Sequence, residues 1–401
     1  MGARRALPAA PVPLWRRLPA DPAEHFTADE VRRSKDYTRP IKRARRISAP
    51  FGWVATILWI WFDVGPWTAE RVGGPWPIQL IGVLVLFVLA AGAVGAPLSL
   101  WRKLVHDKRW GFSKATLGQI AIDAVKGSIL IVVIASALLI PIWALLRSTD
   151  LWWLWGAAVI AGVQLVLRFL APFLLRIFNR FEPLPDGSLK ERLAAIAASI
   201  DAPVSDYLVM DASKRTSKDN AMFTGVGKTK QVILFDNILE MPDEQVAVVV
   251  AHELGHWRRA RPIRDTIVGV ATWPLSLGII ALVASQGVVL RFAGVSSLGE
   301  PGALPLFIGT LLASAEITQV GSAWWARVQE RQADLDALEL TRDPEAFAGT
   351  WKSMRDRNLP DLDPSWLERL KASHPPIAER LAFGQIWARA NTRSAAGTPG
   401  A

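Results

Sequence analysis

The chain has 401 residues, a net charge of +10, 19 Trp and no Cys. Half of its residues are hydrophobic (51%) and the mean hydropathy is +0.23, which is too apolar for an ordinary soluble protein and indicates an integral membrane protein. The absence of Cys excludes disulfides, thiolate metal sites and a Cys nucleophile, so any transition-metal site must use His and carboxylate ligands.

Residues 1–49 are basic, contain scattered Pro and lack the apolar core of a signal peptide, so we expect a flexible cytoplasmic tail. Residues 50–178 and 263–323 hold six apolar segments, at roughly 50–64, 77–100, 119–146, 151–177, 263–289 and 303–323. A membrane helix needs about 20 apolar residues, so five of these segments are long enough to span. The first is short and interrupted by Asp63, so it either crosses the membrane or re-enters it.

The distribution of Lys and Arg predicts the topology, because cytoplasmic loops are enriched in both. The loop between the second and third segments carries Arg102, Lys103, Lys108, Arg109 and Lys114, and should lie inside. The loops at 65–76, 147–150 and 290–302 carry one basic residue each and should lie outside. We therefore expect a multi-pass protein of the plasma membrane with six spans and both termini in the cytoplasm. Basic residues placed in this way serve topology, so we expect no nucleic-acid partner.

Residues 179–262 are too polar to lie in lipid and form the first part of a predicted extramembrane domain. The pattern indicates a helix at 189–200 and strands at 206–211 and 231–235, with Gly225 and Gly227 marking a turn between the strands.

The motif His252-Glu253-Leu254-Gly255-His256 ends this stretch. Acidic residues at its start and basic residues followed by Pro262 at its end predict a helix. On a helix, His252 and His256 share one face and Glu253 projects beside them. Two imidazoles hold Zn²⁺ without cancelling its charge, and Glu253 can take a proton from the activated water and pass it to the leaving amine. The alternative, a structural helix with two His, would bury an unpaired Glu among Val and Ala.

Catalytic zinc needs a third protein ligand and an open position. The best candidate is Glu330, on a helix that continues from the sixth apolar segment, and Asp334 lies one turn later, where it could accept the second N–H of an imidazole. The alternative is that both acids lie on a solvated helix face, and the residues alone leave the two readings equal. Because the fifth and sixth segments form a hairpin, the mostly helical stretch 324–390 emerges beside 179–262. Residues 391–401, rich in Gly, Ala, Ser and Thr, indicate a disordered tail.

Glu316 is a rival ligand, but it lies 14 residues before Glu330, about 21 Å along a helix and therefore at membrane depth. It shares that depth with other polar residues: Asp63, Asp123, Lys126, Gln164 and Arg168. Such residues normally face the interior of a helix bundle or water. Helix–helix pairing and a wet cavity explain them equally well.

Several motifs resemble the membrane M48 metallopeptidases of the Ste24 type, the CAAX prenyl protease 1 family. Besides HELGHW, they are Trp110–Gly118 (the family's HGFNxxTLG), Ala212–Thr216 with Asn220–Gly225 and Val232–Asn237 (its GSKRS, NAYFxGFG and VLFD), Glu330–Asp334 (its EFQAD) and Ser373–Arg380 (its SHPPLLERL). They occur in the family's order over residues 100 to 385. The resemblance implies a predominantly α, multi-spanning fold that encloses a chamber and carries an α+β gluzincin-like peptidase domain on the cytoplasmic face.

The resemblance also implies roles for individual residues. His252, His256 and Glu330 would bind one Zn²⁺ per chain, Glu253 would be the base, and Asp334 would support a ligand. His374 would stabilise the oxyanion. The implied substrate-binding residues are Asn220 and Ala221, on an edge strand that pairs with extended peptide, and Arg380, which would pair with substrate or with a carboxylate.

The implied activity is that of a zinc metalloendopeptidase that processes CAAX-box proteins, with a peptide or protein substrate that is prenylated or membrane-associated. Two departures from the family pattern are six spans where eukaryotic relatives have seven, and Ser217-Lys218-Asp219 in place of SHS. One alternative is membrane-protein quality control of the HtpX type. Another is a non-enzymatic channel, transporter or scaffold, which would be expected to have lost Glu253 or a metal ligand.

Overall fold

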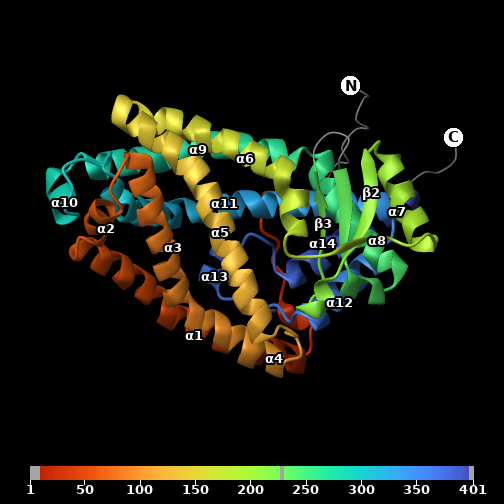
Figure 1. Cartoon of the computed structure of the whole chain (residues 1–401). Helices are drawn as coiled ribbons and strands as arrows, with labels where there is room; N and C mark the ends of the chain where they lie inside the picture. Colours follow the sequence, from red (N-terminus) through yellow and green to blue (C-terminus); the bar gives the residue numbers. More distant parts are fainter. Residues whose placement is uncertain (1–9, 226–229, 397–401) are drawn as a thin grey trace. The chain divides into compact units, whose positions relative to one another are not determined.

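The computed structural model describes residues 10–225 and 230–396 (Figure 1). The chain forms two compact units, each assembled from separate stretches of sequence. Unit 1 comprises Met1–Pro40, Arg168–Ile263 and Gln319–Ala401, and unit 2 comprises Ile41–Leu167 and Arg264–Thr318.

Long apolar helices dominate unit 2. In chain order the helices that build it or run into it are α1 (Ala28–Trp61), α2 (Val64–Val72), α3 (Trp76–Leu100), α4 (Asp107–Arg109), α5 (Leu117–Ser148), α6 (Trp152–Arg176), α9 (Arg261–Ala284), α10 (Gly287–Phe292) and α11 (Leu304–Thr341). A π-helical turn over Trp101–His106 joins α3 to α4. Among the described residues, five helices are long and apolar enough to cross a membrane, and α1 with α2, bent by 60° at their junction, are a sixth if they form one span. This agrees with the five or six expected spans.

Local signals explain where these helices begin. Thr116 and Gln119 form a capping box in which each side chain bonds the backbone N–H of the other, so α5 starts at Leu117. Within unit 2 the helices pack around Trp143 and Phe307, whose rings lie 5.0 Å apart and are almost fully buried. Most other apolar side chains on the spans are exposed or only partly buried, as suits residues that face lipid.

The predicted flexible tail over residues 1–49 differs from the structure. Helix α1 begins at Ala28, because the backbone N–H of Thr27 donates to Glu30 and the N–H of Glu30 donates to the Thr27 hydroxyl. Lys and Arg are good helix formers, so the basic composition that indicated a tail is also compatible with a helix. Before α1, Leu18 and Phe26 are buried in the hydrophobic clusters of unit 1. Residues 1–9 lie outside the described part of the chain.

Unit 1 contains a four-stranded sheet in the order β1-β2-β4-β3. Its strands are β1 (Phe181–Pro183), β2 (Val204–Met210), β3 (Ala221–Thr224) and β4 (Lys230–Phe235), and all neighbouring pairs are antiparallel except β2 with β4. The predicted strands at 206–211 and 231–235 are β2 and β4. Strands β1 and β3 were not predicted, because three or four residues are too few to show an alternating pattern. Gly225 has a φ of 94°, as a turn requires, whereas Gly227 lies outside the described residues.

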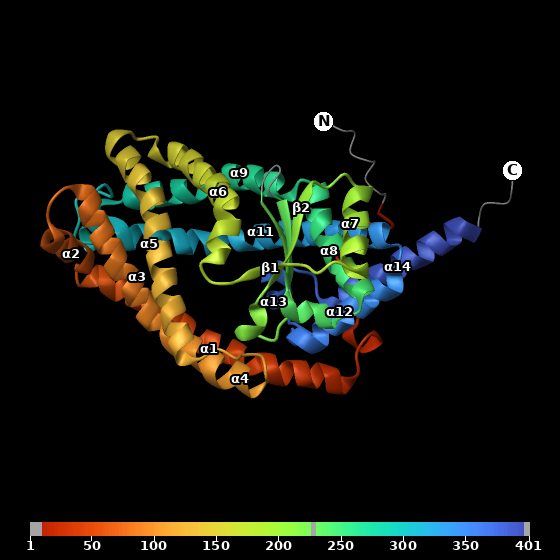
Figure 2. The ribbon, with the colours of Figure 1, turned by 45° about the vertical axis from the view of Figure 1, so that its right-hand side comes forward.

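The helices of unit 1 are α7 (Ser188–Ser199), α8 (Asp243–Arg258), α12 (Pro344–Asn358), α13 (Trp366–Lys371) and α14 (Ile377–Ala396), together with the end of α11. Helix α8 packs against β3 and α7 (Figure 2). Val232 and Leu234 of β4 join α8 in the main core, while Ile233 between them packs on the opposite side of the sheet. Residues 391–396 continue α14, so the predicted disordered tail is wrong for those residues, and 397–401 lie outside the described part.

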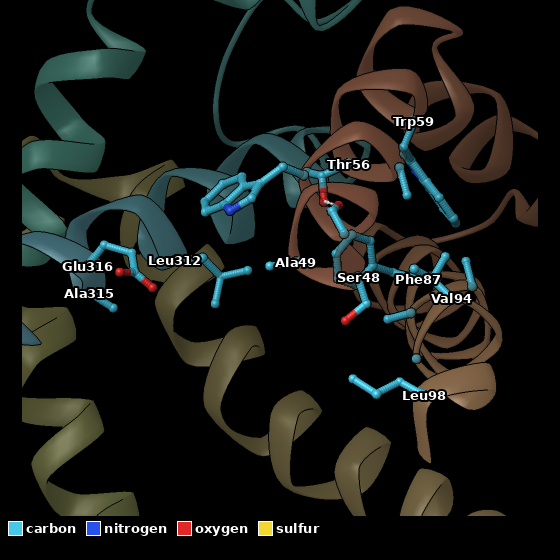
Figure 3. A pocket seen from close by; sticks show the side chains of 16 residues that line it. Ser48, Ala49, Thr56, Trp59, Phe87, Val94, Leu98, Leu312, Ala315 and Glu316 are labelled. Atoms are coloured by element: carbon cyan, nitrogen blue, oxygen red, sulfur yellow. Dashed lines mark hydrogen bonds between the residues drawn. The ribbon is translucent and has the colours of Figure 1, made fainter. Parts of the chain in front are cut away.

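An apolar pocket of about 500 Å³ lies within unit 2, between α1, α3 and α11 (Figure 3). Small residues such as Ala49, Gly52 and Ala91 leave the space open. Glu316 lines it and is the one ionisable residue among its described lining residues. Glu316 thus lies beside a cavity of the helix bundle, which is one of the two explanations that the sequence left open.

Candidate metal centre

Helix α8 places the two imidazoles of the motif together. It begins after Pro242 with acidic residues in its first turn and ends at Arg258, where Ala260 takes a left-handed conformation and α9 begins. The segment before the motif, Val246–Ala251, is buried in the core. One turn apart on this anchored helix, the rings of His252 and His256 lie with their centroids 4.7 Å apart.

Close packing of α8 on α11 brings Glu330 to these imidazoles. A Cβ atom on Gly255 would lie 2.9 Å from Cβ of Asp336 and 3.1 Å from Cα of Ala333, so only glycine permits this approach. Asp336, which is fully buried, also accepts hydrogen bonds from Arg258 at 2.8 Å and from Arg259. The contact and the ion pairs hold the end of α8 against the turn of α11 that follows Glu330.

The three candidate ligands have a spacing that suits zinc. The Nε2 atom of His252 lies 3.4 Å from Oε2 of Glu330, and Nε2 of His256 lies 3.4 Å from Oε1. One ligand atom from each residue lies within 4.8 Å of the other two. Tetrahedral Zn²⁺ with bonds of about 2.0–2.1 Å separates its ligand atoms by about 3.4 Å. Two imidazoles and one carboxylate, with only 2% of the Glu330 side chain exposed, therefore fit this ion.

A cationic side chain already contacts these ligand atoms. The Nη1 atom of Arg261 lies 2.8 Å from Nε2 of His256 and 2.7 Å from Oε1 of Glu330. The guanidinium of Arg261 thus contacts the same atoms of His256 and Glu330 that would bind a metal ion. In the sequence, Arg261 is one of the basic residues before Pro262 that predict the end of the motif helix. Its short spacing from His256 was the one signal that could have marked it.

Two further residues hold the ligands in place. Oδ1 of Asp334 lies 2.9 Å from Nδ1 of His252, close enough for a hydrogen bond though not well aligned for one. Arg380 donates to Oε2 of Glu330 at 2.7 Å, and its Nε lies 3.2 Å from Oδ2 of Asp334. The Arg380 guanidinium also lies 3.7 Å from the ring centre of Trp351. Its burial among these groups favours the carboxylate-pairing reading of Arg380 over a substrate contact.

The surroundings shift the two imidazoles in opposite directions. Burial lowers the pKa of His252, but the Asp334 and Glu330 carboxylates outweigh it and raise that pKa to about 9. For His256 burial prevails and lowers the pKa to about 4. At neutral pH, His252 therefore holds a proton that a metal must displace to bind there.

Glu253 and strand β3 lie side by side. Burial raises the pKa of Glu253, although a hydrogen bond from the backbone N–H of Phe223 in β3 acts in the other direction. Strand β3 is at the edge of the described sheet. Ala221 begins it and is buried, while Asn220 just before it is exposed and accepts a bond from the N–H of Phe235 through its carbonyl oxygen. The strand that resembles the family's substrate strand therefore lies at an edge of the described sheet, and its binding of substrate stays a prediction.

His374 lies at the rim of the site. Its side chain is 65% exposed, its Nε2 is 3.5 Å from Oε2 of Glu330, and its Nδ1 is 2.9 Å from the hydroxyl of Ser373. Arg327 donates to the carbonyl oxygens of Leu370 and Ala372, which fixes the segment that precedes His374. The structure thus brings His374 together with the candidate ligands, Asp334 and Arg380, and places Glu253 beside Phe223 of β3. Asn220 and Ala221 lie at the start of that strand and have no contact with the ligand group among the described interactions.

Comparisons with known proteins cover most of the chain and agree with a membrane peptidase. Residues 14–180 match the family model for the CAAX prenyl protease N-terminal region with five membrane helices, and residues 183–386 match that for peptidase family M48. A CAAX prenyl protease 1 homolog of Arabidopsis thaliana is 29% identical over 80% of this chain and 79% of its own length. A probable CAAX prenyl protease 1 of Schizosaccharomyces pombe is 27% identical over 92% and 82%. The crystal structure of S. mikatae Ste24p matches the fold with a TM-score of 0.79 and 23% identity, over 92% of this chain and 91% of that chain.

Proposed function

Because the chain belongs to peptidase family M48 and is an integral-membrane metalloendopeptidase, we propose that it cuts peptides with one Zn²⁺ held by His252, His256 and Glu330. The observation that carries this assignment is the convergence of these three side chains, with separations that suit tetrahedral zinc. The alternative of a non-enzymatic channel, transporter or scaffold is not supported, because the family is a peptidase family and every predicted active-site residue is present.

The chemistry is divided among the residues at the site. When bound, zinc acts as a Lewis acid toward the scissile carbonyl and the attacking water. Glu253 accepts the proton of that water and returns it to the leaving amine, a role that suits a carboxylate whose pKa burial raises. His374 at the rim donates to the oxygen that becomes negative in the transition state. Asp334 and Arg380 keep His252 and Glu330 oriented.

Strand β3 supports the proposed mode of substrate binding. An extended peptide can add to a free sheet edge through its backbone. The N–H of Phe223 in β3 points to Glu253, so a peptide that pairs along this edge from Asn220 and Ala221 would pass the base.

The substrate and orientation follow from the relatives and from charge. The most similar curated relatives include several CAAX prenyl protease 1 homologs, so we assign prenylated CAAX-box proteins as the substrate class. We assign the protein to the plasma membrane, with unit 1 on the cytoplasmic side. The basic residues of the loop that contains Lys108 and Lys114 support this orientation.

Two peptides and one variant test the proposal. The purified protein should cleave a farnesylated CAAX peptide at least tenfold more efficiently, in kcat/KM, than the same peptide without the farnesyl group. Glu253→Gln should lose about 10²–10⁴-fold in kcat while its zinc content, measured by mass spectrometry, stays at one per chain. Equal cleavage of both peptides would favour a general quality-control protease instead. Full activity of Glu253→Gln would refute the assignment of the base.

A further inference from the structure

A second pocket lies beside α11 in unit 1, with a volume of about 240 Å³. Four guanidinium groups line it, from Arg17, Arg327, Arg331 and Arg369. They come from the N-terminal segment, α11 and α13, so the fold gathers them from distant parts of the sequence. None of the four belongs to the metal ligand set.

The carboxylates that contact these arginines do not balance their charge. Glu379 contacts two of them, Arg331 at 2.8 Å and Arg17 at 3.3 Å. Asp363 contacts Arg369 at 3.4 Å but also pairs with Lys35 at 2.5 Å. Arg327 donates to two backbone carbonyls rather than to a carboxylate. Arg369 also donates to the carbonyl oxygen of Pro364. Within the described residues the pocket therefore has a surplus of positive charge, which phosphate oxygens would complement.

Three tryptophans surround these arginines. Trp15, Trp324 and Trp366 all line the pocket and are 64%, 49% and 73% exposed. Tryptophan is enriched where a membrane protein meets the headgroup region, because the ring prefers that half-polar layer. Large exposed aromatic side chains gathered around one pocket are otherwise unusual on a protein surface.

The sequence of α11 places the pocket at that layer. From Leu304 to Ala326 the helix contains one ionisable residue, Glu316, and Arg327 is the first charged residue after it. Trp324 and Arg327 therefore occupy the turn where the apolar part of α11 ends. Arginines at this depth, beside exposed tryptophans, lie level with lipid phosphates.

We propose that this pocket binds the phosphate group of an anionic phospholipid. Free inorganic phosphate shares the same chemistry, but the tryptophan rim has a purpose only where acyl chains and glycerol adjoin the phosphate. Arg331 also donates to the carbonyl oxygens of Leu14 and Arg16, so the N-terminal segment forms one wall of the site. A bound headgroup would thus contact part of residues 1–49, which the sequence predicted to be a flexible tail.

Lipid binding to the purified full-length chain in neutral detergent tests this site without substrate. Native mass spectrometry should show one tightly bound phosphatidylglycerol and much weaker binding of phosphatidylcholine with the same acyl chains. The double variant Arg17→Gln, Arg369→Gln should weaken phosphatidylglycerol binding at least tenfold. Arg16→Gln is the matched control, because its exposed side chain has the same charge and does not line the pocket, and it should change binding less than twofold.

Two further measurements separate the lipid from other ligands. Trp366→Ala should weaken phosphatidylglycerol but leave any binding of inorganic phosphate unchanged. If inorganic phosphate binds as tightly as the lipid, or if Arg16→Gln weakens lipid binding as much as the double variant, the lipid assignment is overturned. It is equally overturned if the double variant keeps its lipid affinity but raises KM for peptide in lipid-free detergent. Zinc content and thermal midpoint equal to wild type confirm that each variant is folded.

Discussion

At the scale of single residues, Glu330 is where four elements meet. Its carboxylate contacts the imidazoles of α8, Arg261 at the start of α9 and Arg380 of α14, while its backbone belongs to α11. Burial raises the pKa of Glu330, but hydrogen bonds from His252 and His256 and the charge of Arg380 outweigh it, so the carboxylate stays ionised, which is the form that binds a metal. Arg380 bonds Oε2 of Glu330 and fixes the carboxylate, whereas Arg261 lies against the ligand atoms of His256 and Glu330 and must move for a metal to bind there.

Replacement of Glu330 by Gln should therefore remove most of the bound metal. An amide binds zinc far more weakly than a carboxylate, and we expect the zinc content to fall from about one to below about 0.1 per chain after dialysis. Glu316→Gln, on the same helix, is the matched control and should retain its zinc. Full zinc occupancy in Glu330→Gln, or loss of zinc in Glu316→Gln, would assign the third ligand to another residue. Mass spectrometry of the metal measures both.

At the scale of elements, the packing of α8 on α11 decides whether the site forms. Gly255 is the point of closest approach, because a side chain there would collide with Ala333 and Asp336. An Ala in a helix normally stabilises it by about 1 kcal/mol relative to Gly. At Gly255 the collision should outweigh this gain, so the substitution to Ala should lower the stability of the protein.

Gly255→Ala should destabilise the protein by about 1–3 kcal/mol through overpacking and should weaken zinc binding as Glu330 moves from the imidazoles. Gly321→Ala, in α11 where an added Cβ would meet no neighbouring atom, should leave stability unchanged or raised. Thermal unfolding in detergent, with and without added zinc, measures the difference. Equal midpoints for the two variants would contradict the packing argument.

The stability of the first turn of α1 should depend on pH, because Glu30 of the Thr27–Glu30 capping box is ionisable. The backbone N–H of Thr27 lowers the pKa of Glu30. A lowered pKa in the folded state means that the stabilisation is present at neutral pH and lost as the pH falls below the ordinary value of Glu, about 4.3. Protection of the first turn of α1 against hydrogen exchange should therefore be retained at pH 6 and decrease toward about pH 3 in wild type. Glu30→Gln keeps a capping-box acceptor but cannot ionise, so its protection should be the same at both values, as the Thr116–Gln119 cap illustrates. A decrease with pH in that variant equal to that of wild type would disprove the role of Glu30.

At the scale of the whole molecule, the location of the N-terminal residues bears on the number of spans. Residues before Pro40 and the stretch from Arg168 belong to the same unit, with Leu18 packed in the same core as Leu234. The chain must therefore cross the membrane an even number of times between them. Helices α3, α5 and α6 supply three crossings, so α1 and α2 together must supply the fourth. We thus expect six spans, with the bent pair as the first.

Cysteine labelling can test this topology cleanly, because the chain has no Cys of its own. Single cysteines at Arg16 and Lys114 should be protected from a membrane-impermeant maleimide in intact cells, and one at Asp150 should react. All three positions are on exposed segments. Labelling of Arg16→Cys and Asp150→Cys from the same side would mean that the bent pair re-enters the membrane instead of crossing it.

Relations between neighbours along the chain could be predicted from the sequence. The apolar spans, α7, β2 and β4 and the pairing of His252 with His256 all depend on periodicity within one element. The residues alone left Glu330 undecided between ligand and solvated acid, and the family resemblance favoured the ligand. The short strands β1 and β3 escaped prediction because sheet partners, not local pattern, define them.

By itself, therefore, the sequence determined the class of protein, the helical spans and the two imidazoles with their adjacent base, because helix geometry is local. The tertiary structure alone decided what lies beside them. It placed Arg261 on the ligand atoms, made Gly255 the contact between α8 and α11, and packed the N-terminal segment against Arg331. The reason is physical: these contacts join residues far apart in the chain, and which helix faces meet depends on the packing of the whole unit.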